Sequence, residues 1–206
     1  MVAGATARER APVSIAAIVL AAGCATRMGS QKVLLELEGR SLVQRVVDAA
    51  LGSRATRTIV VVGHEAGSVT DDLTGRPVTV VVNPEYAAGM STSLQAGVRA
   101  AGACDGAIFL LGDQPYVTAA LLDQLIERFA ETRKAVVRPL VGARPANPVL
   151  LSAALFAEIL EQRGDVGGRE IVERHPGEVC LVPLDDPTLV VDIDSPQDYE
   201  AARGST

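Results

Sequence analysis

The chain has 206 residues, of which 48% are hydrophobic and 21% charged, and its net charge is −6. This composition is typical of one globular domain and excludes disordered or collagen-like chains. No apolar run approaches the ~20 residues of a membrane-spanning helix, so we expect no membrane partner. The acidic balance argues against a general nucleic-acid binder, which would normally show a basic face.

Three widely spaced cysteines and only two histidines suggest neither a disulfide framework nor a zinc site. This pattern favours the reducing cytoplasm. The alternative is a lipoprotein leader, because an apolar stretch (13–22) precedes Cys24, but cleavage there would delete the first predicted strand. We therefore interpret residues 1–13 as a flexible N-terminal extension and residues 14–206 as a single domain.

Apolar, β-branched runs alternate with helical patterns along the chain. In the first two thirds, strands are predicted at residues 15–20, 58–62, 78–82 and 107–111, with helices from a Ser41 cap to Leu51, from Ser91 or Ser93, and from a Thr118 cap.

The remainder is less regular. It predicts strands near residues 135–139, 148–151, 179–183 and 189–192, a helix at 152–162, and a last helix from Pro196. Continuous apolar runs indicate strands that are covered on both faces, and helical segments between them indicate βαβ units. The chain therefore predicts an α/β fold, a three-layer Rossmann-like sandwich with a mostly parallel sheet.

The stretch LAAGCATRMGSQK (residues 20–32) leaves the end of the first predicted strand. Gly23 and Gly29 permit close backbone approach, and backbone amides beside the cations Arg27 and Lys32 suit a polyphosphate. A nucleoside triphosphate carries about −4, a magnesium ion offsets two of these charges, and the two cations offset the rest. The alternative is an ordinary turn with solvated charges. The spacing matches neither a Walker loop nor the dinucleotide motif GxGxxG.

Two later segments also break the core pattern. GDQP (residues 112–115) places Asp113 directly after a buried strand, at the sheet edge where ligands bind, and a carboxylate suits Mg²⁺. NPEYAAGMSTSLQAG (residues 83–97) leads from a strand into a helix, and Gly89 permits close approach. The alternatives are turn formation for the first segment and helix capping by the serines for the second. We interpret His64 and His175 as structural or solvated, and the Asp71–Asp72 pair as solvated.

Together these segments resemble the MobA-like nucleotidyltransferase family, most closely its molybdenum-cofactor cytidylyltransferase branch. The family pattern LAAGxSxRMGxxK, the asparagine-to-serine stretch and the GDxP turn occur in order. They are followed by NPV (147–149), GDVGGR (164–169) and DIDSPQD (192–198), so that the resemblance covers roughly residues 15–200. Two departures are Ala25, where the motif has serine, and Ala146, where relatives often have glycine.

The resemblance implies the fold of nucleotide-diphospho-sugar transferases and a reaction in which a phosphate on an acceptor attacks the α-phosphorus of a nucleoside triphosphate. Pyrophosphate leaves, with Mg²⁺ as the cofactor. LAAG rather than LAGG favours CTP, and the branch implies a phosphorylated molybdopterin-type acceptor with a molybdoenzyme as recipient. Two alternatives stay open: an NAD(P)H-dependent oxidoreductase of the nicotine-blue-reductase kind on the same fold, and a non-catalytic molybdenum-cofactor carrier.

The resemblance also implies roles for individual residues. Asp192 would be the second metal carboxylate beside Asp113, in preference to Asp194, whose Asp-Ser-Pro context also suits a helix cap. The catalytic set would be Arg27, Lys32 and Asp113; the nucleotide-binding set Leu20, Ala21, Ala22, Gly23, Arg27, Lys32, Asn83, Gly89, Ser93 and Leu94; and the acceptor-binding set Arg144, Asn147 and Arg169.

Overall fold

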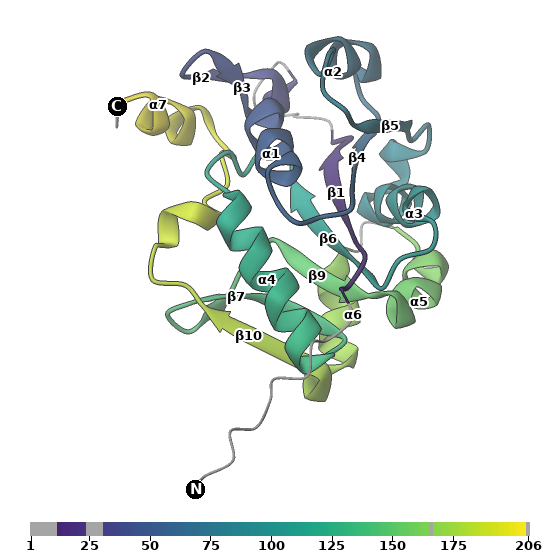
Figure 1. The fold of residues 1–206 in the computed structure, drawn as a ribbon. Helices are drawn as coiled ribbons and strands as arrows, with labels where there is room; N and C mark the ends of the chain where they lie inside the picture. Colours follow the sequence, from purple (N-terminus) through teal and green to yellow (C-terminus); the bar gives the residue numbers. More distant parts are fainter. Residues whose placement is uncertain (1–11, 24–30, 165–166, 205–206) are drawn as a thin grey trace, which may run out of the picture.

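The computed structural model describes residues 12–23, 31–164 and 167–204, which form an eight-stranded sheet between two helical layers (Figure 1). The strand order is β10-β7-β9-β6-β1-β4-β5, with β8 paired to β7. Only β9 and β8 run antiparallel to their neighbours in this described sheet. The expected three-layer, mostly parallel α/β sandwich is thereby confirmed. The strands are β1 (Ile15–Ala21), β4 (Arg57–Val62), β5 (Thr79–Val82), β6 (Gly106–Leu111), β7 (Val136–Val141), β8 (Arg144–Pro145), β9 (Val149–Ser152) and β10 (Val179–Pro183), besides a separate hairpin of β2 (Glu36–Leu37) and β3 (Arg40–Ser41).

Each face of the sheet has its own helical layer and its own core cluster. One face carries α1 (Leu42–Leu51), α2 (Ala66–Asp72) and α4 (Ala119–Thr132); the other carries α3 (Met90–Ala101), α5 (Phe156–Glu161) and α6 (Gly168–Arg174). The last helix, α7 (Pro196–Gly204), packs beside the β2–β3 hairpin through a third, small cluster (Figure 1).

Strand β1 shows how the sequence produces this sandwich. Its alternate residues point to opposite faces, so Val19 packs in the α1–α4 cluster whereas Ile18 packs beneath α3. Both are fully buried, which is why the run is apolar without alternation. Helix α3 lies close to the strand at Gly97, where an added Cβ would come within 2.5 Å of Ile18 Cγ2.

The predicted caps of α1 and α4 are confirmed, because Ser41 and Thr118 accept hydrogen bonds from the backbone N–H groups of Gln44 and Leu121. The predicted helix α3 is present and begins at Met90, but neither serine caps it: its N-cap is Gly89 at φ 116°, a backbone conformation that suits glycine.

Three further predictions need correction. The strand expected at residues 189–192 is a 3-10 helix over Pro187–Val190 followed by irregular chain, and the helix expected at 152–162 divides into a 3-10 turn (Ala153–Leu155) and α5. Asp72 is not simply solvated, since it accepts hydrogen bonds from Ser41 and Gln44. Helices α2 and α6 were not predicted, because each buries a single described residue and so leaves almost no apolar periodicity.

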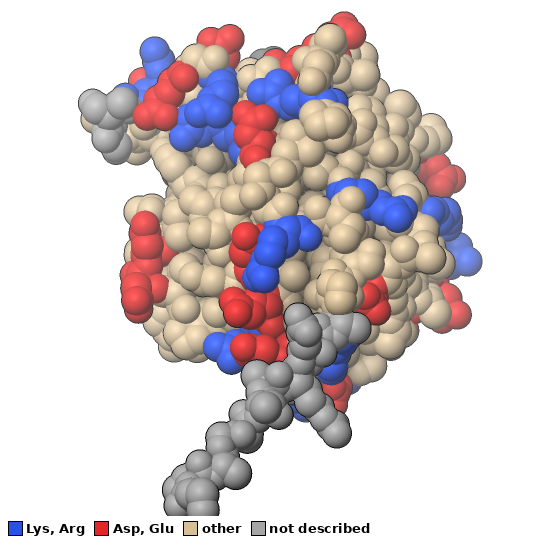
Figure 2. Space-filling model, in the orientation of Figure 1, with Lys and Arg blue, Asp and Glu red and all other residues tan. Residues whose placement is uncertain are grey.

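None of the helices in the described part of the chain has both the length and the apolar character required to cross a membrane. On the face shown in Figure 2, basic and acidic side chains are interspersed among uncharged ones rather than gathered into separate regions.

Candidate active site

A cleft of about 880 Å³ lies at the carboxyl ends of the parallel strands β1, β4 and β6. Its walls come from the end of β1, the turn after β6, and the segment that leads into α3. This is the edge at which open α/β sheets bind ligands. Of the residues expected at a nucleotide site, the cleft is lined by Leu20, Ala21, Ala22, Gly23, Lys32, Gly89, Ser93 and Asp113.

Lys32 is the cation of this cleft in the described chain. It lies in the 3-10 turn Lys32–Leu34, with its Nζ 2.6 Å from Asp113 Oδ2 and 2.8 Å from Asp194 Oδ1. Burial lowers the pKa of Lys32, but the hydrogen bonds to the two carboxylates outweigh it and leave the pKa raised. The side chain is therefore a permanent cation between two carboxylates.

Asp192 lies beside Asp113 and Lys32, and its pKa is unusually high for an aspartate. Burial, and next the charge of Asp113, raise the pKa of Asp192 to about 6, although a hydrogen bond from Gln114 opposes the shift. The chain segments that carry these carboxylates are joined by a hydrogen bond from Ile193 N to Asp113 O of 3.0 Å. The acidic cluster thus combines the turn after β6 with the segment before α7.

The cluster offers oxygen donors to a divalent cation. Asp113 Oδ1 and Asp192 Oδ1 are both buried without a hydrogen-bond partner, and buried polar atoms of this kind are rare unless a ligand, ion or water completes them. No three His, Cys, Asp or Glu side chains of residues 12–23, 31–164 and 167–204 form a metal site by themselves. Two carboxylates nevertheless fit Mg²⁺, which usually takes one or two of them together with substrate phosphates.

A second cavity, of about 780 Å³, adjoins the cleft and shares Leu20, Met90 and Leu111 with it. Arg144, Asn147 and Arg169, the residues expected to contact the acceptor, all line this second cavity. Arg138 from the middle of β7 lines it too, and the sequence analysis did not single it out.

Two expected nucleotide-site residues, Leu94 and Asn83, do not line the cleft. Leu94 lines the second cavity rather than the cleft. Asn83 is buried and lines neither cavity, because its side-chain N–H groups donate to Thr92 and Ser93 and its Oδ1 accepts from Glu85 N. Arg27 lies outside the described residues.

The cleft contains residues that sequence reasoning missed. Gln31 is 3% exposed, donates from Nε2 to the His64 carbonyl at 2.8 Å, and leaves its Oε1 without a partner. His64 and Tyr86 lie with ring centroids 5.9 Å apart, and Gly63 leaves room for Tyr86, whose Cβ would be 2.6 Å from an added Cβ. The signal for His64 was its place just after β4, at the same sheet edge as Asp113.

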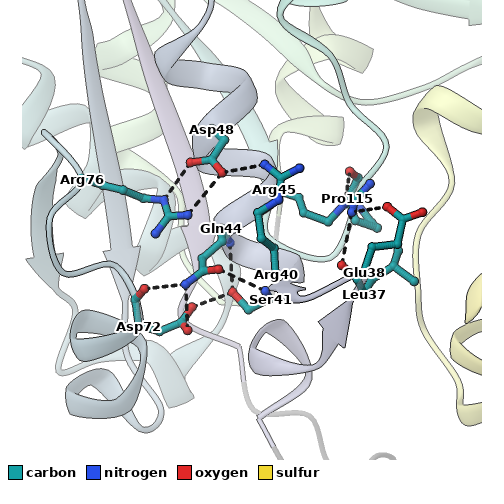
Figure 3. Close-up of polar contacts among 10 residues, drawn as sticks. All are labelled: Leu37, Glu38, Arg40, Ser41, Gln44, Arg45, Asp48, Asp72, Arg76 and Pro115. Carbon is teal, nitrogen blue, oxygen red and sulfur yellow. Dashed lines mark hydrogen bonds and ion pairs between the residues drawn. The ribbon is translucent and has the colours of Figure 1, made fainter.

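A network of polar contacts around α1 holds the frame of the cleft together (Figure 3). Arg45 donates to the carbonyl of Pro115, in the turn that carries Asp113, and to Leu37 and Glu38 in the hairpin. On the next turn of α1, Asp48 pairs with Arg76 at 2.7 Å; this hydrogen bond is the largest cause of the lowered pKa of Asp48, and burial opposes it. Helix α1 thereby fixes the hairpin, the turn after β6 and the loop after α2 to one another.

Comparison with known proteins adds a family to this geometry. The family model of the MobA-like NTP transferase domain matches residues 17–179. The molybdenum cofactor cytidylyltransferase of Escherichia coli K12 is 25% identical over 92% of this chain and 96% of its own length. The nicotine blue oxidoreductase of Paenarthrobacter nicotinovorans is 27% identical over 88% of this chain and 92% of its own length.

Solved structures give the same picture. A nucleotidyl transferase from Methanothermobacter thermautotroptrophicus is 31% identical with a TM-score of 0.80, and the match covers 93% of this chain and 97% of the other. The protein Rv0371C of Mycobacterium tuberculosis H37Rv, solved in complex with manganese, is 26% identical with a TM-score of 0.80 over 94% of this chain and 100% of the other.

Proposed function

Because this chain belongs to the family of MobA-like NTP transferase domains and is a nucleotidyltransferase, we propose that it transfers CMP from CTP to a small phosphorylated acceptor of the molybdopterin type. The observation that supports this best is the joining of the cleft at β1 and β6 to a second, arginine-lined cavity. Two substrates could thus lie side by side along one sheet edge.

The first substrate would occupy the cleft with its triphosphate near Lys32. The nucleotide would have to draw Lys32 away from Asp113 and Asp194, because both carboxylates hold it in this structure. Gly23, two residues after β1, is exposed, and no atom of the described residues lies within 4 Å of an added Cβ, so its backbone is open to a phosphate. We propose Arg27 as the second cation, beside Lys32, that binds the triphosphate.

Asp113 and Asp192 would hold the divalent cation, which we propose is Mg²⁺. A bound divalent ion supplies charge neutralisation for the phosphates, which is the main demand of phosphoryl-type transfer. The unpartnered Oδ1 atoms of both side chains support this assignment. Once Lys32 turns to the nucleotide, Asp113 Oδ2 also becomes available.

The protein's own contribution is positioning rather than covalent participation. Leu20 and Leu111, which line both cavities, would separate the nucleotide from the body of the acceptor while leaving their phosphates in contact. Gly89 and Ser93 would border the base, with Gly89 holding the chain open at φ 116°. The preference for CTP and for a molybdopterin-type acceptor rests on LAAG (20–23) and on the Escherichia coli relative.

The test is a screen of the four nucleoside triphosphates with Mg²⁺ and phosphorylated acceptors, read as pyrophosphate release. We expect release only with CTP and a molybdopterin-type acceptor present together. Release that needs no acceptor, or equal release with all four nucleotides, would contradict the assignment. Binding of CTP without any release above the blank would instead indicate a non-catalytic carrier.

A second candidate function is an NAD(P)H-dependent oxidoreductase, because the Paenarthrobacter relative matches at an identity similar to that of the cytidylyltransferase. A thermal-shift titration separates the two, since a ligand that binds only the native state raises its melting temperature. We expect CTP with Mg²⁺ to raise it and NADPH to leave it unchanged.

A further inference from the structure

The second cavity has two unlike sides. Leu94, Phe109, Val149 and Val172 give it an apolar floor, whereas Arg138, Arg144 and Arg169 bring three cations to it. Its one carboxylate among the described residues is Glu173, which pairs with Arg169 at 2.7 Å. The described lining therefore carries an excess of positive charge beside apolar surface, although the whole chain is acidic.

Arg138 is the cation that the fold holds most firmly. It lies inside β7 between the buried residues Val137 and Pro139, so its stem is fixed by the sheet. Its Nε donates to the carbonyl of Ala146 at 3.0 Å, and Ala146 N in turn donates to the carbonyl of Pro139 at 2.9 Å. Because the contacts of Ala146 run through its backbone, the alanine at this position does not disturb them.

The charge of Arg138 is not compensated by the described part of the protein. No carboxylate of residues 12–23, 31–164 or 167–204 forms an ion pair with it, and its hydrogen bond goes to a neutral carbonyl. Burial, and next the positive charge of Arg169, lower the pKa of the Arg138 guanidinium. An arginine stays protonated under such conditions, so a half-buried cation without a carboxylate partner among the described residues is a cost that a bound anion would relieve.

Strand register places this cation relative to the cleft. Val137 of β7 and Ile108 of β6 both lie opposite Leu150 of β9. Arg138 is therefore level with Phe109 and two strands away, which is about 10 Å at the usual strand spacing. Asp113 lies beyond the end of β6, so the acidic cluster and the arginines lie at different ends of one joined crevice.

We propose that Arg138, assisted by Arg144 and Arg169, binds an anionic group of the acceptor at the end remote from the nucleotide, while the apolar floor receives the acceptor's body. The identification of the ligand as the acceptor rests on the proposed function, whereas the anion site itself does not depend on it. Arg138 is the preorganised element, whereas Arg169, 86% exposed, closes on the ligand from the surface.

The test uses phenyl phosphate as a probe, because it combines an oxyanion with a flat apolar body, and measures its binding by calorimetry. We expect saturable binding to the wild-type chain and a loss of affinity of about tenfold or more in Arg138→Met, since the variant removes the charged hydrogen-bond donors of the site. The matched control is Arg128→Met, which removes an exposed arginine of α4 that pairs with Glu131. It should bind phenyl phosphate as the wild type does.

Two further variants keep the result interpretable. Arg138→Lys retains the charge and should lose less affinity than Arg138→Met, which a merely structural role would not predict. Lys32→Met should lose CTP but keep phenyl phosphate, because Lys32 lies in the other cavity.

The proposal is overturned if the wild type shows no saturable binding, if Arg138→Met binds normally, or if Lys32→Met rather than Arg138→Met abolishes binding of the probe. A parallel titration with CTP and Mg²⁺ separates this result from the proposed function. Binding of phenyl phosphate that depends on Arg138, without any binding of CTP, would reject the cytidylyltransferase and leave the anion site in place.

Discussion

The two joined cavities differ in how the chain builds them. Most of the cleft comes from three short, contiguous stretches, residues 20–23, 31–33 and 111–113, of which the first and the last lie at the carboxyl ends of β1 and β6. The lining of the second cavity is spread over more elements, since α3, β6, β7, β8, β9 and α6 all contribute to it. A reacting centre built on strand ends is rigid, whereas a cavity built from scattered residues can change one contact at a time. Differences in the acceptor among relatives are therefore expected to lie in the second cavity.

The strongest way to separate the two cavities is Asp113→Asn. The variant keeps the shape of the side chain but removes a charge that the proposed metal site needs, so we expect turnover to fall roughly a hundredfold, since a metal ion contributes several kcal/mol. Steady-state pyrophosphate release measures this. Phenyl phosphate should bind the variant as it binds the wild type, and unchanged turnover would remove Asp113 from the mechanism.

Gly97→Ala tests a feature that the two cavities share, because α3 supplies Ser93 to the cleft and Leu94 to the second cavity. The new Cβ would lie 2.5 Å from Ile18 Cγ2, so α3 must shift, and we expect the free energy of unfolding to fall by about 2 kcal/mol. Urea denaturation measures it. The matched control is Gly67→Ala in α2, where no atom lies within 4 Å; it should stabilise the chain by about 0.5–1 kcal/mol.

Asp192→Asn sharpens the description of the acidic end. In the metal-free protein, the pKa of Asp192 is raised from 3.8 to about 6 by burial and by the charge of Asp113, with a smaller contribution from Asp194 and opposition from Gln114 and Lys32. Between about pH 4 and pH 6 the native state therefore holds a proton that the unfolded state has released. This contribution to stability is complete below pH 4 and is lost as the pH rises through 6.

We expect Asp192→Asn to abolish that part of the pH dependence, as measured by urea denaturation at a series of pH values. It should also weaken Mg²⁺ binding by roughly tenfold at neutral pH, if each carboxylate contributes about 1.4 kcal/mol to the ion. A variant that retains the wild-type profile between pH 4 and pH 6 would show that another group carries the titration.

Sequence reasoning named residues that line both cavities, but it did not single out Arg138, and the reason is physical. Asp113 directly follows the turn at the end of β6, and Lys32 closes the stretch (20–32) that leaves the end of β1. Because parallel strands bring their carboxyl ends to one edge, the sequence placed both residues at that edge. Arg138 stands within a strand, where its direction depends on the pairing of β7 with β9, which runs antiparallel. An apolar pattern shows where strands lie but not which strands pair or in which direction, so it did not predict this pairing.

The same distinction explains why Asn83 lies outside the cleft, and why the sequence alone does not separate Asp192 from Asp194. Asn83 follows a strand, as a ligand-binding residue would. Its side chain is instead hydrogen-bonded to Thr92, Ser93 and the backbone N–H of Glu85, which only the geometry of the turn shows. The preference for Asp192 over Asp194 was based on helix-cap chemistry. In the structure both flank Ile193, with Asp194 on Lys32 and Asp192 beside Asp113. A spacing of two residues along an irregular segment cannot decide between them.

The smallest expected effect concerns the N-terminus of α1, the helix whose polar contacts support the cleft. Ser41 caps α1 by accepting from Gln44 N at 3.1 Å, and its hydroxyl also donates to Asp72, so it links α1 to the end of α2 (Figure 3). Ser41→Ala should lower the free energy of unfolding by about 1 kcal/mol, the usual contribution of an N-cap, as measured by urea denaturation.

Thr118→Ala is the matched control, because Thr118 caps α4 through one hydrogen bond of 3.3 Å from Leu121 N. It should cost less, since no second contact is lost, and equal costs would mean that the bond to Asp72 adds nothing. Neither variant should alter phenyl phosphate binding, because neither residue contacts the arginine-lined cavity.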